Sequence, residues 1–526
     1  MRRRPVGVAV AALTALIAAA RPIAQQTTLQ IEEATIAQVH AEMRAKRLTC
    51  RALVDHYLRR IETYDKQGAA INAIVVVNTN AGDEADEMDR RFASSGPVGP
   101  LHCIPAIVKD NFETVGLQSA AGSLALEGFV SDKDAFLVRR IKDAGAIVLA
   151  KSNMAEWAFS PYETVSSILP GYTRNPYALN RVTAGSSGGT AAAVAANFGM
   201  IGLGSDTGNS IRGPSAHQAL AGIRSTMGLT SRAGVVPLNL LADVAGPMTR
   251  TLEDAVAVFQ VIVGEDPADP VTARSRGRTI PDYKTALVTD GLKGARIGIL
   301  RPAYERQTTD EEVVEVFMRA VDDLKAAGAT IVDPAPVERV QRGRGGGGGG
   351  GGPCMGFKYD INQWLASHGD RVPVKSLDDI VKGRRFHPSV QMRLQSAQES
   401  NPQGPDSAAC QAEREYREAF GAAITKAMDE QKLDAFVYPT WSNPPRLIGD
   451  LMTPHGDNSQ VYSPTSGFPA INVPMGYTRE NTLPAGITFF GRAWDEATLI
   501  KLAYAYEQAT RHRRPPASTP PLARPR

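Results

Sequence analysis

A strand, a helix and a second strand follow one another between residues 104 and 153, and this order most limits the possible folds. The segment IPAIVKDN (104–111) is apolar until it reaches Lys109. DAFLVRRIKDAG (134–145) has a helical period, and AIVLAKSN (146–153) is apolar again. Two buried strands joined by a helix are typical of a parallel crossover unit. The pattern therefore predicts an α/β protein.

Later segments repeat this alternation of strands and helices. MIGLGSD (200–206), ARIGIL (295–300) and DAFVYP (434–439) are short apolar runs that read as further strands. SSGGTAAAVAANFG (186–199) is a helix of small side chains, which predicts close packing against a sheet. Residues 31–67 have the period of two amphipathic helices with a break near Leu48–Thr49.

The N-terminus is predicted to be a secretory signal peptide over residues 1–24. Three arginines precede an apolar run from Val6 to Ala20, and small residues follow as far as Ala24. The apolar run is shorter than the roughly 20 residues that a membrane-spanning helix needs. A membrane anchor is the alternative. We expect the mature protein to be secreted or periplasmic, without stable membrane insertion.

The rest of the chain reads as one domain over residues 27–510. Eight glycines at 345–352 predict a flexible loop, and the sequence after them predicts a mainly helical insertion at 354–432. The last residues, 511–526, are rich in proline and arginine and predict a disordered tail. No internal repeat stands out.

Charge and cysteine content exclude several functions. The 526 residues carry a formal net charge of +3, too little to indicate a nucleic-acid partner. Cys50, Cys103, Cys354 and Cys410 permit two disulfides, and their spacing leaves all three connectivities open. No pair has the CxxC spacing of a zinc site and there is no HExxH motif. The sequence calls for no metal or cofactor.

Two serine-bearing stretches lie close together, and neither has a histidine at the position where a serine hydrolase would need one. TAGSSGGT contains Ser186 and Ser187, and GSDTGNSIRGPS contains Ser210. Residues 185–189 match the G-x-S-x-G motif of α/β-hydrolases, which would make Ser187 the nucleophile of an esterase. That motif needs a strand directly before it, whereas the preceding residues are polar and turn-like.

Lys109 is the other candidate for the base. A serine hydroxyl must give its proton to a base as it attacks, and lysine serves only as the neutral amine. The usual pKa of lysine, about 10.4, leaves very little neutral amine at pH 7, but burial lowers it. Lys109 follows the apolar run from Ile104 to Val108, which favours burial. Ser186 could relay the proton from Ser210 to Lys109.

At these residues the sequence resembles the amidase signature family of serine hydrolases. GSSGGTAAAVA and GLGSDTGNSIRGPSA are similar to the signature of that family, and IPAIVKDN is similar to the strand that carries its lysine. The resemblance runs from about residue 30 to about residue 508. It implies an α/β fold with a large mixed, mainly parallel β-sheet core flanked by α-helices.

The resemblance also implies a Ser-cisSer-Lys triad. Ser210 would be the nucleophile, Ser186 would follow a cis peptide bond, and Lys109 would be the base. The oxyanion hole would consist of backbone N–H groups from Thr207, Gly208, Asn209 and Ser210.

Asn209 departs from the family pattern, which has a second glycine at this position. If the turn needs a positive φ there, asparagine is the least costly replacement for glycine. We expect its amide to crowd or contact the substrate. Ser187, Asp206 and Arg212 would support the site, the last two as a buried pair.

Side chains near the site have two interpretations. Met154 and Trp157 either line an acyl pocket or belong to the core.

These features predict an exported hydrolase of C–N amide bonds in small molecules. It would work through an acyl-enzyme, as a monomer or homodimer. Esters and carbamates would pass through the same tetrahedral oxyanion. The alternatives are an esterase that uses Ser187, a component of a transamidation enzyme for charged tRNA, and a non-catalytic binding protein. The signal peptide and the weak net charge oppose the tRNA alternative, and Asn209 is the feature that favours the binding protein.

Overall fold

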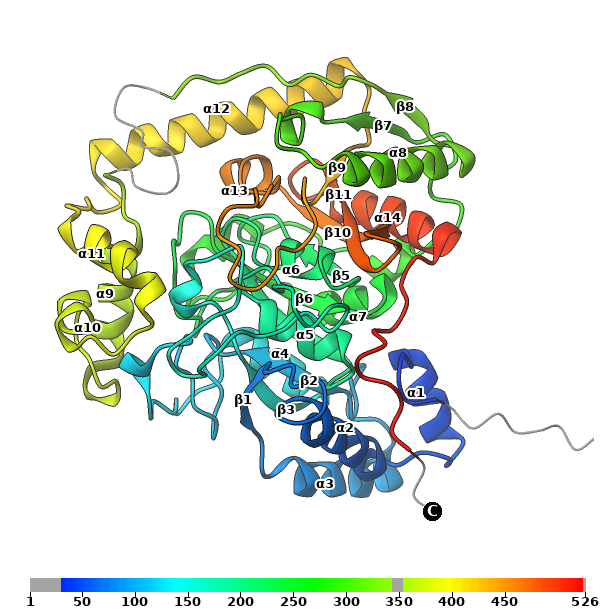
Figure 1. Ribbon diagram of the computed structural model, residues 1–526, viewed down its shortest axis with the longest axis vertical. Helices are drawn as coiled ribbons and strands as arrows, with labels where there is room; N and C mark the ends of the chain where they lie inside the picture. Colours follow the sequence, from blue (N-terminus) through cyan, green and yellow to red (C-terminus); the bar gives the residue numbers. More distant parts are fainter. Residues whose placement is uncertain (1–29, 343–352, 524–526) are drawn as a thin grey trace, which may run out of the picture.

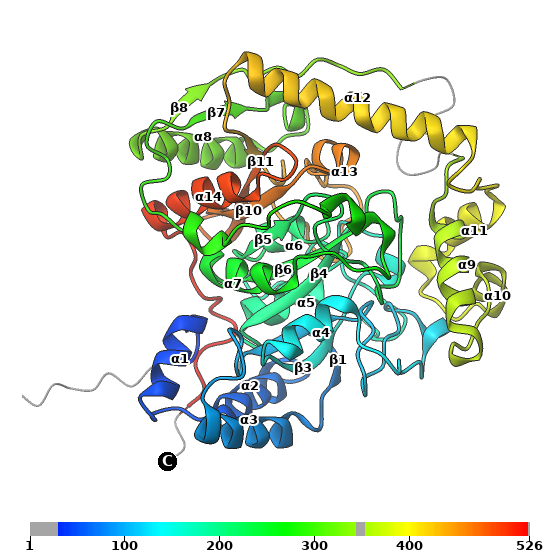
Figure 2. The ribbon, with the colours of Figure 1, turned by 180° about the vertical axis from the view of Figure 1, so that it is seen from behind.

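The computed structural model describes residues 30–342 and 353–523. A single sheet of 11 strands runs through this part of the chain, in the order β1-β3-β2-β4-β6-β5-β10-β11-β9-β7-β8 (Figures 1 and 2). The strands are β1 (Ile74–Val77), β2 (Pro105–Lys109), β3 (Ile147–Ser152), β4 (Ile201–Asp206), β5 (Ala221–Arg224), β6 (Val244–Thr249), β7 (Arg296–Ile299), β8 (Thr330–Val332), β9 (Ala435–Pro439), β10 (Ala470–Thr478) and β11 (Leu483–Phe490).

The sheet is mixed, and its two flanks contain the parallel pairs. β2 lies between β3 and β4, parallel to both, and β7 lies between β8 and β9 in the same way. The central pairs, from β4 to β9, are antiparallel, as is β1 on β3. The predicted α/β class and large mixed sheet are confirmed. The resemblance implied a mainly parallel sheet, which overestimated the parallel share, because the central pairs that include β5, β6, β10 and β11 are antiparallel.

Helices cover both faces of the sheet (Figures 1 and 2). They are α1 (Ile36–Arg44), α2 (Cys50–Tyr64), α3 (Ala81–Ser95), α4 (Phe136–Asp143), α5 (Gly188–Ala195), α6 (Arg212–Ala216), α7 (Leu252–Ile262), α8 (Glu311–Ala326), α9 (Phe357–His368), α10 (Leu377–Gly383), α11 (Gln391–Glu399), α12 (Ala408–Glu430), α13 (Tyr462–Ser466) and α14 (Glu496–Thr510). The predicted break at Leu48–Thr49 separates α1 from α2. There the Thr49 side chain caps α2 by accepting the N–H of Ala52.

Helix α5 brings the glycine- and alanine-rich segment against the sheet. All of its residues are buried, and it packs on β2 and β4. Small side chains permit this close contact, as the sequence predicted. As a result Ser186 and Ser187, directly before α5, lie at the ends of β2 and β4, the strands that carry Lys109 and Asp206.

The predicted insertion is helical and packs against the main body through a second apolar cluster. Helices α9 to α11 form a separate lobe, and the long helix α12 returns from it along the edge of the molecule (Figure 1). Phe357, Ile361 and Leu365 of α9 pack in one apolar cluster with Met154 and Trp157 of the main body. A disulfide joins Cys354 to Cys410 across the base of this lobe.

The C-terminal segment is ordered up to residue 523, so the prediction of a disordered tail is wrong for residues 511–523. The segment runs along one side of the molecule towards α1 and α2 (Figure 1). Arg513 forms an ion pair with Glu33, and Arg60 of α2 donates hydrogen bonds to the carbonyl groups of Thr519 and Pro520. The composition predicted disorder, but the segment forms an ion pair and hydrogen bonds with residues that are far away in the sequence.

The predicted signal peptide and glycine loop lie outside the described residues. Within residues 30–342 and 353–523, no helix combines the length and the apolarity needed to cross a membrane.

Candidate active site

Lys109 and Ser205 meet because their strands are parallel neighbours. β2 and β4 pair in register from Ala106 to Val108, so their carboxyl ends lie at the same edge of the sheet. Lys109 is the last residue of β2, and its Nζ lies 2.8 Å from Ser205 Oγ and 3.4 Å from the Ser205 carbonyl oxygen. Its third contact is Ser186 Oγ, at 2.7 Å.

These contacts suit a neutral lysine. Burial lowers the pKa of Lys109 to about 7, although the charges of Asp206 and Asp243 oppose the shift. A neutral amine has two N–H groups and one lone pair. The two oxygens of Ser205 can accept both N–H groups, which leaves the lone pair to accept a hydrogen bond from the Ser186 hydroxyl.

The serines of the SSGG segment lie between Lys109 and Ser210. The peptide bond between Gly185 and Ser186 is cis. Ser187 N donates to the Ser210 carbonyl group at 3.3 Å, which places this segment beside the second serine stretch. The hydroxyl of Ser187 donates to the Ser205 carbonyl group at 3.2 Å and therefore helps to fix the position of Ser205.

The turn between β4 and α6 leaves backbone donors free. Among the described residues, no group accepts a hydrogen bond from the N–H of Thr207, Gly208, Asn209 or Ser210. Free backbone donors beside a buried serine could stabilise a developing oxyanion. The oxyanion hole itself remains a prediction.

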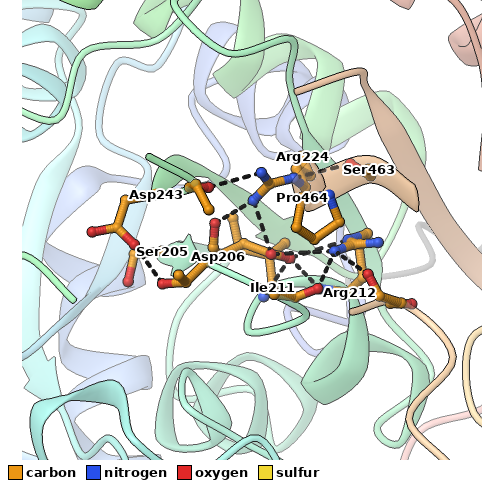
Figure 3. Close-up of polar contacts among 12 residues, drawn as sticks. Ser205, Asp206, Ile211, Arg212, Arg224, Asp243, Ser463 and Pro464 are labelled. Atoms are coloured by element: carbon orange, nitrogen blue, oxygen red, sulfur yellow. Dashed lines mark hydrogen bonds and ion pairs between the residues drawn. The ribbon is translucent and has the colours of Figure 1, made fainter. Parts of the chain in front are cut away.

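Buried charges fix the shape of this turn. Arg212 and Arg224 both form ion pairs with Asp206, at 3.1 and 3.0 Å, and all three side chains are buried (Figure 3). Asp206 also accepts the N–H of Ile211. Burial alone would raise the pKa of Asp206, but the charges of the two arginines outweigh it and lower the pKa to about 2. The carboxylate therefore stays ionised and the turn stays braced.

Arg212 also ties the turn to a distant loop. Its Nη2 donates to the Gly208 carbonyl group at 2.6 Å and to the Ser459 carbonyl group at 3.3 Å. Ser459 belongs to the segment between β9 and α13, which thus lies against the turn that contains Ser210.

The turn does not need a positive φ at position 209. Neither Gly208 nor Asn209 has a positive φ. The Asn209 side chain is fully buried and packs against Gly213, and a Cβ at position 213 would lie 2.1 Å from its Nδ2. We expected this amide to crowd or contact the substrate. This expectation is corrected, because the amide is buried against α6.

The features required for an esterase based on Ser187 are missing. Within the described residues, no strand lies between β3 and α5, so the G-x-S-x-G motif has no strand before it. The Ser187 hydroxyl donates a hydrogen bond to the Ser205 carbonyl group, and none of the described histidines is hydrogen-bonded to this hydroxyl. His217, the nearest histidine after it in the sequence, stacks on Trp441 instead.

Several site residues could not be found from the sequence. Ser205 lies on the strand beside that of Lys109, and Arg224 ends a strand that is two places from the strand of Asp206. Asn111 donates to Ser205 Oγ at 3.0 Å. A serine or arginine at a strand end carries no signal until the strand order is known. Met154 and Trp157 pack in the apolar cluster with α9, which supports the core interpretation for both.

Comparison with known proteins places the chain in a family. The family model described as Amidase matches residues 52–500. A probable amidase of Arabidopsis thaliana is 33% identical over 96% of this chain and 95% of its own length. A glutamyl-tRNA(Gln) amidotransferase component from a Synechococcus strain is 30% identical over 93% of this chain and 94% of its own.

Solved structures give the same result. Native peptide amidase from Stenotrophomonas maltophilia superposes with a TM-score of 0.82 and 35% identity, covering 93% of this chain and 99% of its own. An amidase family protein from Bacillus anthracis has a TM-score of 0.80 and 30% identity, covering 92% of each chain. The fold and the family match thus define a hydrolase of the amidase class. The chain belongs to the amidase signature family.

Proposed function

We propose that this protein hydrolyses C–N amide bonds with Ser210 as nucleophile, Ser186 as proton relay and Lys109 as base. The observation that carries the proposal is the 2.7 Å contact between Lys109 Nζ and Ser186 Oγ. It joins a lysine with a pKa of about 7 to a serine beside the Ser210 turn. A buried lysine with no charged partner in contact is costly to maintain, and such groups concentrate at functional sites.

Acylation would begin with attack of Ser210 Oγ on the amide carbonyl carbon. The Ser210 proton passes to Ser186 Oγ while the Ser186 proton passes to Lys109 Nζ. The carbonyl oxygen becomes an oxyanion, which the free N–H groups of residues 207–210 stabilise. Each well-placed donor contributes roughly 3–4 kcal/mol in the transition state.

The intermediate then collapses. The C–N bond breaks as the proton returns from Lys109 through Ser186 to the leaving nitrogen, which departs as an amine or ammonia. Water attacks the Ser210 ester by the same proton route, which releases the carboxylic acid and restores the serine. Lys109 thus acts as general base and then as general acid, both in acylation and in deacylation.

The substrates we propose are small linear amides. The structural neighbour from Stenotrophomonas is a peptide amidase, which supports amides of peptide-like compounds. Esters and carbamates form the same type of tetrahedral oxyanion, so we include them as secondary substrates.

We also propose that the protein is exported, to the periplasm or the medium. Two disulfides, Cys50–Cys103 and Cys354–Cys410, support this, because disulfides persist mainly in oxidising compartments. N-terminal sequencing of the protein from its source cell tests the proposal. Cleavage near Ala24 and no free thiol after unfolding would support it, whereas an intact N-terminus with four free thiols would refute it.

The other candidate functions have less support. The disulfides are unfavourable for a component of a tRNA transamidation enzyme, which would meet its tRNA inside the cell. The position of Asn209 against Gly213 removes the obstruction that had favoured a non-catalytic binding protein.

The first test is to map a covalent adduct. Mature protein is treated with a fluorophosphonate probe and digested, and the modified serine is located by mass spectrometry. We expect the adduct on Ser210 and its loss in Lys109→Ala, with hydrolysis of a panel of primary amides by the unmodified protein. An adduct on Ser187, or no adduct and no hydrolysis, would contradict the proposal.

A further inference from the structure

Gln460 lies directly beside the proposed oxyanion turn. A Cβ at Gly208 would lie only 2.1 Å from Gln460 Oε1 and 3.1 Å from its Nε2. Gly208 has no positive φ, so its backbone conformation does not require glycine. The contact with Gln460 explains why residue 208 has no side chain. Gln460 is an exposed residue, whereas Ser210, two residues after Gly208, is buried.

The position of Gln460 relative to the turn is rigidly held. Arg212 donates to the carbonyl groups of Gly208 and of Ser459, the residue before Gln460. One buried guanidinium therefore joins both segments, and the ion pair with Asp206 holds that guanidinium in turn (Figure 3). The chain around Gln460 cannot shift without breaking bonds that also shape the turn.

The orientation of the Gln460 amide is also fixed. Its Nε2 donates to Asp457 Oδ2 at 2.6 Å, and the other Asp457 oxygen accepts the N–H of Ser459 at 3.0 Å. Burial raises the pKa of Asp457 to about 6, so the carboxylate is ionised at neutral pH and only accepts hydrogen bonds. The NH₂ side of the amide must face Asp457, which leaves Oε1 on the side of Gly208.

An acceptor at this point discriminates between substrates. Among the described residues, no donor is hydrogen-bonded to Gln460 Oε1. An acceptor beside the oxyanion turn repels the leaving oxygen of an ester and pairs with the N–H of a leaving nitrogen. The leaving nitrogen of a primary or secondary amide carries such an N–H. This nitrogen is bonded to the same carbon as the carbonyl oxygen. An ester or a tertiary amide has none.

We propose that Gln460 Oε1 accepts a hydrogen bond from the N–H of the leaving nitrogen, and so selects amides that carry an N–H over esters. This inference rests on the proposed amide hydrolysis at Ser210. It makes Gln460 a specificity-determining residue and Asp457 the residue that orients it.

The test compares three substrates with the same acyl group: a 4-nitroanilide, its N-methyl derivative and the 4-nitrophenyl ester. Gln460→Leu removes the acceptor at nearly the same volume. We expect kcat/KM for the anilide to fall about tenfold, the effect of one lost hydrogen bond of roughly 1.4 kcal/mol. The ester and the N-methyl anilide should stay within about twofold. Asp457→Asn should shift the anilide-to-ester ratio in the same direction, because it frees the amide to turn.

Gln411→Leu is the matched control, an exposed glutamine of α12 far from Gly208 in sequence and free of contact with it. The inference would be overturned if Gln460→Leu lowered kcat/KM equally for all three substrates, or if it left the anilide-to-ester ratio unchanged. If Gln460→Leu lowers the melting temperature, Gln460→Met replaces it under the same criteria. Absence of amide hydrolysis and of Ser210 labelling in the unmodified protein would instead refute the proposed function, so the two failures are distinguishable.

Discussion

The side chain of Asn209 occupies the space that a side chain at position 213 would need. A Cβ on Gly213 would lie 2.1 Å from Asn209 Nδ2 and 2.7 Å from its Cγ. Gly213 N also donates to the Asn209 carbonyl group at 2.8 Å. Gly213 is in helix α6 and has no positive φ, so the space taken by Asn209 accounts for the glycine. The two residues are complementary in size and lie on either side of Ser210, the proposed nucleophile, in the sequence.

This pairing predicts that the effect of Gly213→Ala changes sign with residue 209. Beside Asn209, the added methyl group should destabilise the protein by about 1–3 kcal/mol through overpacking and should lower kcat by displacing the turn. In Asn209→Gly, the same change should stabilise the protein by up to about 1 kcal/mol, because alanine favours a helix. Urea unfolding and amide kinetics of the four proteins form a double-mutant cycle. Additive effects would show that the residues are not coupled.

The buried lysine predicts the pH dependence of the reaction. Lys109 acts as base only when neutral, and its pKa is lowered to about 7. We expect kcat/KM to be nearly constant above pH 8 and to fall about tenfold per pH unit below pH 6, as the amine becomes protonated. Initial rates in buffers of constant ionic strength measure the profile. A rate that stays constant down to pH 5 would exclude Lys109 as the base.

Replacing the base gives an independent check. Lys109→Ala should reduce kcat by about 10²–10⁴-fold. Ser205→Ala keeps the lysine but removes one hydrogen-bond partner of Nζ, at 2.8 Å, so a smaller loss with a shifted pH profile is expected. Equal activity of Lys109→Ala and the unmodified protein at pH 7 would contradict the mechanism.

The network around Asp206 predicts a large effect on stability. Asp206→Ala leaves Arg212 and Arg224 buried without their carboxylate, which should cost about 3–5 kcal/mol. Lys426→Ala removes an exposed ion pair with Glu338 and should change the free energy of unfolding by less than about 1 kcal/mol. Equilibrium unfolding in urea measures both variants. Similar values for the two would mean that the buried network does not brace the fold.

The C-terminal segment offers a matched pair of arginines. Arg513→Ala removes a half-buried ion pair with Glu33 and should lower the melting temperature by several degrees. Arg511→Ala, two residues earlier, changes an exposed side chain and should have little effect. If both variants have the same melting temperature as the unmodified protein, the docking of residues 511–523 contributes nothing to stability.

Local pattern was enough to predict the flanks of the sheet and the helices between their strands. Alternation of apolar runs and helical periods located β2, α4 and β3, and the small side chains located α5. The positions of Lys109, Ser186 and Ser210 followed from their motifs, since residue type and sequence neighbours carry that information. Their chemical roles are the part that the experiments above test.

Tertiary structure alone decided the rest. Ser205 meets Lys109 because β2 and β4 are neighbours, and Gln460 meets Gly208 because a buried arginine joins two segments that are some 250 residues apart. The antiparallel strands at the centre of the sheet and the docked C-terminal segment depend on pairings of the same kind. Contacts at such separations leave no periodicity in the sequence, because the two residues come into contact only after the chain has folded.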